Sequence, residues 1–292
     1  MASTRDIRRR IKSVKSTAQI TKAMQMVAAS KMRKAQLSAL AGRPYATAMN
    51  RMLAELLPAT GDFSHPLMER REDGKRCVIL VSTDKGLCGA LNSALFREAV
   101  KFDKDTTVFI SAGRKAGQFL ARARRTMLAE FSYKDSPLFN EARAISKFAQ
   151  DGFLKGEYNQ VDVLFTNFIS TLTQRPEVLQ LLPISEIRGV SSDHHGEDLG
   201  TQLLKGATEF LFEPGAIEVL GALLPHYLNY RMFQVLLEAK ASEHSARMVA
   251  MKNATENANQ LVKDLTLQYN KMRQASITKE LLEIATAQMA LA

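Results

Sequence analysis

From residue 226 to residue 292 the chain contains neither glycine nor proline, the two residues that most often interrupt helices. Apolar side chains recur along this stretch at alternating intervals of three and four, which is the period of one helix face. A continuous helix over most of the stretch would be on the order of 90–100 Å long. Gln234, His244 and Thr255 interrupt the apolar series, which consists of Leu223, Tyr227, Tyr230, Leu237, Ala241, Met248, Met251, Ala258, Val262, Leu265, Tyr269 and Met272.

The N-terminal segment has the same character, because its first glycine is Gly42 and its first proline is Pro44. Ser3 or Thr4 can cap a helix there, and Asp6 suits the positive end of the helix dipole. The sequence therefore predicts an amphipathic helix of roughly 40 residues, about 60 Å long. Its expected seam consists of Ile7, Ile11, Val14, Ala18, Ile20, Met24 and Val27.

Two helices of this length are unusual, because helices in globular proteins average about a dozen residues. One long helix at each end of the chain, each with an apolar seam, predicts an intramolecular antiparallel coiled coil. Both seams are rich in small or flexible residues rather than in leucine and isoleucine. Such seams allow the helices to approach closely but bury little apolar surface, so the coiled coil should associate only modestly.

The middle of the chain alternates between short apolar runs and helical patterns. Strands are expected at 77–82, 106–111, 126–131, 161–168 and 177–184, and helices at 90–101, 113–124 and 137–155. This alternation predicts a Rossmann-like α/β domain with a parallel or mixed sheet. The expected organisation is a first long helix (1–60), a central α/β domain (74–190), a connecting segment (191–215) and a last long helix (216–292).

The excess positive charge belongs to the first segment. Residues 1–50 hold eleven basic residues and one acid, Asp6, and so account for the whole formal charge of +10. A block of one sign on a helix predicts an acidic partner, whether nucleic acid, anionic lipid or protein. No aromatic residue precedes Tyr45 to stack on bases, and the apolar face lacks the bulky residues that favour lipid. A protein is therefore the favoured partner.

Targeting and membrane segments are not expected. No run approaches the roughly 18–20 apolar residues of a membrane span, and the basic start leads into no signal-peptide core. A mitochondrial transit peptide is a closer match, but the pattern continues well past a plausible cleavage point. Cys77 and Cys88 are too few for a disulfide scaffold, which favours a reduced, cytosolic setting.

The sequence offers two weak candidate sites and no convincing catalytic group. The segment 82–92 lies at a strand-to-helix turn of the kind that binds phosphate, yet it lacks both the P-loop ending and the dinucleotide spacing. The segment 113–117 also lacks the P-loop ending and the dinucleotide spacing, so a structural turn is the simpler interpretation of both segments. The histidines show no metal-ligand spacing, and Cys88 has no histidine nearby in the sequence. No catalytic residue, cofactor or metal is expected.

Several motifs carry a resemblance to a known family. They are RRRIKSVKSTAQITKAMQMVA at 8–28, DKGLCG at 84–89, SEHSARMVAMKNAT at 242–255 and RQASITKEL at 273–281. On these motifs the chain resembles the gamma subunits of F-type ATP synthases over essentially its whole length. The resemblance implies a rotor shaft whose terminal helices enter a hexamer of alpha and beta subunits. It places the α/β domain outside the hexamer, with the epsilon subunit and the ring of c subunits.

In that family proton flow turns the ring and the shaft, and the shaft drives the catalytic sites of the beta subunits. The resemblance therefore implies a non-catalytic subunit without a cofactor or a nucleic-acid partner. It also implies a peripheral location at the cytoplasmic face of the bacterial cell membrane. The closely spaced cysteine pair of chloroplast-type gamma subunits has no counterpart here, so redox regulation of that kind is not expected.

The resemblance also implies roles for particular residues. Four basic residues would meet acidic lever segments of beta, and Met24 would lie near that contact. Polar residues near the end of the chain would hydrogen-bond to catch loops of the hexamer, and two residues of the foot would touch the c ring. The lever group is Arg8, Arg9, Arg10 and Lys12; the catch-loop group is Arg273, Gln274, Thr278 and Glu280; the foot group is Phe210 and Glu213.

Two alternatives remain open from the residues themselves. One is a basic coiled-coil protein that binds nucleic acid, which would show salt-dependent affinity for DNA or RNA. The other is an α/β enzyme that binds a small ligand at the loop 86–89, which would show stabilisation by that ligand.

Overall fold

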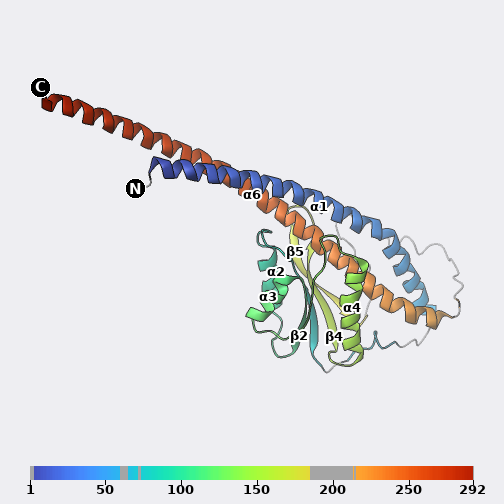
Figure 1. Cartoon of the computed structure of the whole chain (residues 1–292). Coiled ribbons are helices and arrows are strands. Elements are labelled where there is room, and N and C mark those ends of the chain that lie inside the picture. The colour runs from blue at the N-terminus through green and yellow to red at the C-terminus, as the bar shows by residue number, and fades with distance from the viewer. Residues whose placement is uncertain (1–2, 60–64, 72–73, 185–212, 214, 292) are drawn as a thin grey trace. The chain divides into compact units, whose positions relative to one another are not determined.

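The computed structural model describes residues 3–59, 65–71, 74–184, 213 and 215–291. The chain divides into two compact units, one formed by residues 1–29 and 247–292 and the other by residues 30–246. The helices α1 (Thr4–Ala59) and α6 (Ala216–Leu291) each contribute to both units, and the sheet belongs to the second unit (Figure 1). Of the connecting segment expected at 191–215, only residues 213 and 215 are among the described residues.

Helix α1 begins with a reciprocal cap. The Ser3 hydroxyl accepts a hydrogen bond from the Asp6 backbone N–H, and the Asp6 carboxylate accepts bonds from the Ser3 hydroxyl and N–H. This arrangement satisfies N–H groups that a helix start leaves without partners. The hydrogen bonds from Ser3 also hold the pKa of Asp6 below its ordinary value. The predicted cap is therefore confirmed at Ser3.

In the first unit, α1 and α6 lie side by side and run in opposite directions (Figure 1). The hydroxyls of Thr21 and Thr255 are 2.7 Å apart and form a hydrogen bond across the seam. The seam predicted for α6 is confirmed, including its polar interruption at Thr255, because every position in it from 248 to 272 is at least half-buried. The antiparallel coiled coil is thus present, with a polar contact in its seam.

The seam predicted for α1 is correct only in its first half. Ile7 and Ala18 are buried as expected, but Ile20 and Val27 are 57% and 55% exposed. The alternation of three and four continues instead through Thr21 and through residues 25 and 28. The partner helix sets which positions face it, so small and polar residues occupy the seam while large apolar residues lie beside it.

Glycine and proline end neither long helix, so α1 is longer than the roughly 40 residues estimated from its first glycine and proline, and α6 begins before Pro225. Helix α1 has 56 residues and includes Gly42 and Pro44, and α6 has 76 residues and includes Pro225. The Tyr230 hydroxyl donates a hydrogen bond to the Gly42 carbonyl, and a Cβ at Gly42 would lie 2.6 Å from that hydroxyl oxygen. Glycine therefore permits the close approach of the two helices here, and tertiary packing overrides the local preference to stop.

The second unit contains a five-stranded sheet of order β3-β2-β1-β4-β5. The strands β1 to β4 are parallel, and β5 pairs with β4 in the antiparallel sense. The predicted mixed α/β sheet is confirmed. Its elements are β1 (Arg76–Val81), α2 (Leu91–Val100), β2 (Thr107–Ala112), α3 (Arg114–Arg122), β3 (Met127–Phe131), α4 (Phe139–Leu154), β4 (Gln160–Phe168) and β5 (Gln174–Leu182).

The fifth strand starts three residues earlier than predicted and includes Pro176. Proline has no N–H and is excluded from central strands, which is why the sequence pattern starts the strand after it. β5 is an edge strand in this sheet, so Pro176 removes only one donor at the edge.

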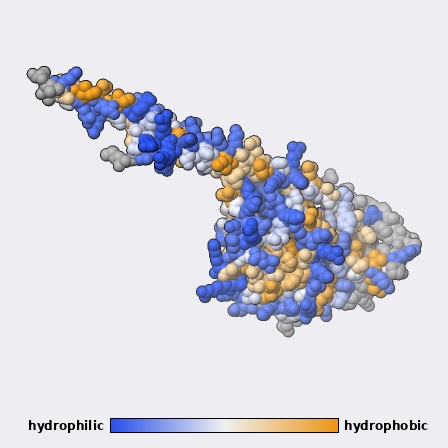
Figure 2. All heavy atoms as spheres, in the orientation of Figure 1, coloured by the Kyte–Doolittle hydropathy of each residue, from blue (hydrophilic) through white to orange (hydrophobic). Residues whose placement is uncertain are grey.

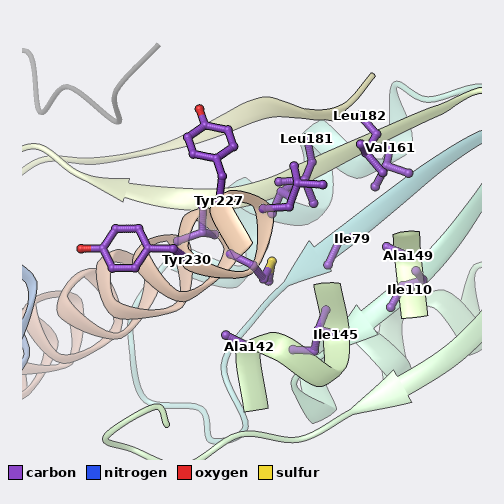
Figure 3. Close-up of a cluster of buried hydrophobic side chains, with 14 of the residues drawn as sticks. Ile79, Ile110, Ala142, Ile145, Ala149, Val161, Leu181, Leu182, Tyr227 and Tyr230 are labelled. Carbon is purple, nitrogen blue, oxygen red and sulfur yellow. The ribbon is translucent and has the colours of Figure 1, made fainter. Parts of the chain in front are cut away.

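Each face of the sheet has its own apolar core. Val78 and Leu80 of β1 pack with side chains of α2 and α3, whereas Cys77, Ile79 and Val81 pack with side chains of α1, α4 and α6. Figure 3 shows this second core, in which Tyr227 of α6 lies near the strand residues. Because both faces are covered, β1 is a nearly continuous apolar run.

Candidate functional site

The four basic residues of the predicted lever group lie on α1 in the first unit. Arg8, Arg9, Arg10 and Lys12 are all exposed, whereas Ile7 beside them is buried in the seam. The coiled coil therefore presents the basic side chains to solvent, where they are available to an acidic surface. Met24 is half-buried, whereas Val27, three residues later on α1, is exposed.

The predicted catch-loop group lies on the last part of α6. Arg273, Gln274, Thr278 and Glu280 are all exposed. The Thr278 hydroxyl donates a hydrogen bond to the Gln274 carbonyl, four residues earlier on the same helix. The structure thus places the lever group and the catch-loop group in one unit but on different helices.

The last part of α6 extends beyond the start of α1. The contact between Thr21 and Thr255 in an antiparallel pair places Thr4, the first residue of α1, opposite Met272. Met272 is the last half-buried residue, and positions 273 to 289 are all exposed. This terminal segment, about 28 Å long at 1.5 Å per residue, still carries large apolar side chains, as Figure 2 shows. They are Ile277, Leu281, Leu282, Ile284 and Met289.

Only one of the two residues of the predicted foot is within the described part of the chain. Phe210 lies outside the described residues. Glu213 is described as an exposed residue that precedes α6.

The strand-to-helix loop after β2, at 113–117, is built as a structural turn against the loop after β1. At the start of α3, the N–H of Arg114 donates to the Asp84 carboxylate at 3.0 Å, and the N–H of Ala116 donates to the Ser82 hydroxyl at 2.7 Å. These are the donors that a phosphate would require, and the chain's own side chains occupy them. A Cβ at Gly113 would lie 2.3 Å from the Ser82 carbonyl oxygen, so glycine is required for this close approach. The interpretation of this loop as a structural turn is supported.

Neither cysteine is placed for catalysis. Cys77 and Cys88 are both buried, and neither forms a disulfide. Burial, followed by the nearby Asp162 carboxylate, raises the pKa of the Cys77 thiol to about 12. A thiol in this state is a poor nucleophile near neutral pH.

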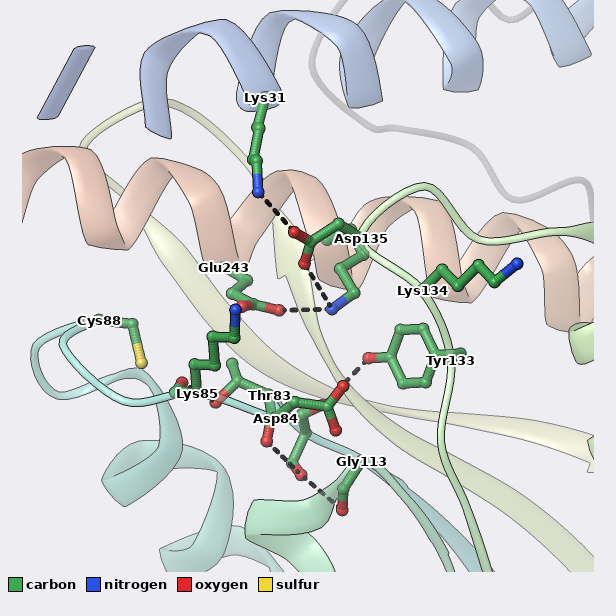
Figure 4. Close-up of polar contacts among 12 residues, drawn as sticks. Lys31, Thr83, Asp84, Lys85, Cys88, Gly113, Tyr133, Lys134, Asp135 and Glu243 are labelled. Atoms are coloured by element: carbon green, nitrogen blue, oxygen red, sulfur yellow. Dashed lines mark hydrogen bonds and ion pairs between the residues drawn. The ribbon is translucent and has the colours of Figure 1, made fainter. Parts of the chain in front are cut away.

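A buried polar cluster was not predicted from the sequence. Lys240 and Glu243 of α6 are 1% and 2% exposed, and the Lys240 Nζ lies 3.0 Å from a Glu243 oxygen (Figure 4). Asp135, in the loop after β3, lies 3.8 Å from the same Nζ and forms an ion pair with Lys31 of α1 at 2.5 Å. A lysine and a glutamate three residues apart on a helix normally indicate a solvated pair, so the sequence carried no signal of this burial.

Two groups of the cluster, Asp135 and Tyr133, have shifted pKa values. The hydrogen bond from Lys31, supported by the charge of Lys240, holds the pKa of Asp135 below its ordinary value. Burial, followed by the charge of Glu243, raises the pKa of Tyr133 well above its ordinary value. The protonated Tyr133 hydroxyl donates to the Ser82 carbonyl at 3.0 Å. Lys31 and Asp135 are about half exposed, whereas Tyr133, Lys240 and Glu243 are buried. We refer to these five residues as the ion cluster.

Comparisons with known proteins agree with this arrangement. A sequence profile of the family described as "ATP synthase" matches residues 3–291. The ATP synthase gamma chain of Opitutus terrae is 49% identical over 294 residues, and that of Methylacidiphilum infernorum is 46% identical over 296 residues. In both comparisons the alignment covers 100% of this chain and of the relative. This chain belongs to the ATP synthase gamma chain family.

Solved structures of more distant proteins share the fold. A rotor chain of the Euglena gracilis mitochondrial ATP synthase matches with a TM-score of 0.64 and 17% identity, covering 94% of this chain and 98% of that chain. A chain from the central stalk and c ring of the Tetrahymena thermophila mitochondrial enzyme matches with a TM-score of 0.59 and 24% identity, covering 80% and 99%. No helix within the described ranges is long and apolar enough to cross a membrane.

Proposed function

We propose that this chain is the central rotor shaft of an F-type ATP synthase. The shaft transmits torque between a membrane ring of c subunits and the catalytic beta subunits, and so couples proton translocation to ATP synthesis or hydrolysis. Membership of the gamma chain family supports this proposal. The chain itself carries no catalytic site and no cofactor in this proposal, because the catalytic sites belong to the beta subunits.

The observation that carries the proposal is the terminal segment of α6. An isolated helix is marginally stable in water, and this one exposes large apolar side chains beyond the end of its partner helix. A surrounding protein partner would cover these side chains. The hexamer of alpha and beta subunits is a partner of that kind, and it would surround the segment on all sides.

The basic residues of α1 support the same partner. Arg8, Arg9, Arg10 and Lys12 would meet acidic lever segments of beta, and Met24 would lie beside that contact. The large apolar residues that the seam leaves exposed, Ile20 and Val27, would add apolar contact to the basic surface. Arg273, Gln274, Thr278 and Glu280 would hydrogen-bond to catch loops near the end of the shaft.

The remaining partners concern the second unit. Phe210 and Glu213 would touch the c ring, and the epsilon subunit would bind nearby. The chain would therefore lie at the cytoplasmic face of a bacterial cell membrane as a peripheral subunit, held there through the complex.

Reconstitution with alpha, beta and epsilon subunits tests the proposal. The expected result is a stable complex in which ATP hydrolysis turns a bead attached to this chain. A chain that remains monomeric in the presence of those subunits, or a complex in which the bead does not turn, would contradict the proposal. Salt-dependent binding of DNA or RNA by that monomer would favour the nucleic-acid alternative.

A charge-reversal variant tests the lever group. Replacing Arg8, Arg9 and Arg10 with glutamate should weaken assembly with the hexamer and make it more sensitive to salt. The matched control replaces Lys101, Lys104 and Lys147, three exposed residues of the α/β domain, with glutamate. Equal effects of the two variants would show that net charge, rather than the lever group, governs assembly.

A further inference from the structure

The sheet of the second unit has a crevice where α/β proteins usually bind ligands. The strand order reverses between β1 and β4, and ligands of open α/β sheets bind beyond the carboxyl ends of the strands at such a point. In this chain the loops 82–90 and 169–173 flank that position.

In this chain, helix α6 occupies the position at which other α/β proteins bind a ligand. The Ser242 hydroxyl donates to the Thr166 carbonyl at 2.9 Å, and the Ser245 hydroxyl donates to the Thr171 carbonyl at 2.8 Å. Backbone groups at the carboxyl end of β4 are therefore bonded to α6.

The ion cluster includes two residues from the same stretch of α6, Lys240 and Glu243. Lys240 contacts both Glu243 and Asp135, and its Nζ lies 4.6 Å from the centre of the Tyr133 ring (Figure 4). Asp135 in turn bonds to Lys31 of α1. Two positive and two negative groups balance, so the cluster carries no net charge.

The cluster connects four parts of the second unit. It contains residues of α1, of α6 and of the loop between β3 and α4, and Tyr133 extends it to the carboxyl end of β1 through the Ser82 carbonyl. Buried ion pairs stabilise a fold little more than apolar residues of similar volume do. Apolar contacts permit a helix to turn or slide, whereas the Lys240–Asp135 ion pair at 3.8 Å and the directional hydrogen bonds of Ser242 and Ser245 favour one position of α6. Resistance to such sliding is the property that distinguishes this cluster from the rest of the core.

We infer that Lys240, Glu243 and Asp135 form a clamp that transmits torque between the two long helices and the sheet. The crevice that binds a ligand in other α/β proteins serves here as the socket that holds the rotating helix. This inference rests on the proposed rotor function, and it assigns to these residues a positioning role rather than a contact with any partner subunit.

The test measures the torsional stiffness of the assembled rotor. A bead is attached to the α/β domain through Lys104→Cys, because Cys77 and Cys88 are buried, in a complex whose hexamer is fixed to a surface. The variance of the bead angle while rotation pauses is inversely proportional to torsional stiffness. The variant is Lys240→Met with Glu243→Gln, which removes both charges and keeps similar volumes.

The double variant should about double the variance of the bead angle, because α6 gains freedom to turn in its socket. The amides of residues 132–136 should exchange with solvent about tenfold faster, since the loop loses its contact with Lys240. A matched control, Lys101→Met with Glu98→Gln, removes an exposed pair of the same spacing and should change neither quantity.

Two further outcomes distinguish a failure of the clamp from a failure of the rotor function. If the parent complex rotates and the double variant leaves the variance unchanged, the clamp is refuted while the rotor function stands. If the parent complex does not rotate, the rotor function fails and the clamp fails with it. Gly152→Ala is a second control, because it should destabilise the α/β domain without altering the clamp residues. If it increases the variance of the bead angle as much as the double variant does, the clamp is also refuted.

Discussion

Replacing Gly152 with alanine tests how tightly α4 packs in the second unit. Alanine in a helix interior is favoured over glycine by about 1 kcal/mol, so local preference predicts stabilisation. The structure predicts the opposite. A Cβ at this position would lie 2.2, 2.6 and 2.7 Å from the Oη, Cζ and Cε1 atoms of Tyr158. Tyr158 is almost fully buried, and its hydroxyl donates a hydrogen bond to the Ala149 carbonyl at 2.8 Å. The ring therefore cannot move aside without losing its buried contacts and this hydrogen bond.

Overpacking in a core costs typically about 1–3 kcal/mol, and three ring atoms inside 3.0 Å place this variant at the upper end. After subtraction of the helix preference, Gly152→Ala should reduce the free energy of unfolding by about 2 kcal/mol. Hydrogen exchange of the slowest amides of β1 and β4 measures this quantity, because those amides exchange when the domain unfolds.

Gly221→Ala is the matched control. Gly221 lies within α6, and no atom lies within 4 Å of a Cβ built there, so this variant should gain up to about 1 kcal/mol. Adding Tyr158→Phe to Gly152→Ala removes the nearest atom and should recover part of the loss. If Gly152→Ala is as stable as the parent protein, the packing at Tyr158 does not restrict this position and the reasoning is wrong.

Three further predictions concern buried and paired groups. Arg76→Met should destabilise the domain by about 3–5 kcal/mol in urea unfolding, because it leaves the buried Asp162 carboxylate without its ion pair, and adding Asp162→Asn should restore most of the loss. The Cys77 thiol should resist iodoacetamide at pH 8 and react only as the protein unfolds, because burial raises its pKa to about 12; rapid labelling of the native protein would contradict this. Asp135→Asn should lower the urea midpoint at pH 7, and because the pKa of Asp135 is lowered in the folded state, the difference should disappear as the pH falls below the ordinary value of 3.8. A difference that persists at low pH would show that the ion pair with Lys31 is not its cause.

Much of the secondary structure could be predicted from local patterns. The continuous apolar run of β1 and the start of α3 at Gly113 follow from strand burial and from the need for glycine beside Ser82. The seam of α6 was predictable because its interruptions are single residues, such as Thr255, that keep the interval of three and four.

The seam of α1 was only partly predictable. After Ala18 the large residues Ile20 and Val27 stand one position away from the seam, and small or polar residues fill it. Apolar character alone does not reveal whether a side chain faces the partner helix of the same chain or a surface left for another protein. The apolar pattern of α1 therefore did not show that Ile20 and Val27 are exposed and available to another protein.

The sequence by itself determined the long helices, the alternation of the central domain and the placement of all the excess charge on the first segment. These features depend on local periodicity and composition, which act within a few residues of one another. Only the tertiary structure decided which side chains of α1 face α6, that α6 fills the crevice at the carboxyl end of β4, and that Lys240 and Glu243 are buried beside Asp135. These contacts bring together residues far apart in the sequence, such as Ser242 and Thr166, which are 76 positions apart, and no local pattern encodes such distances.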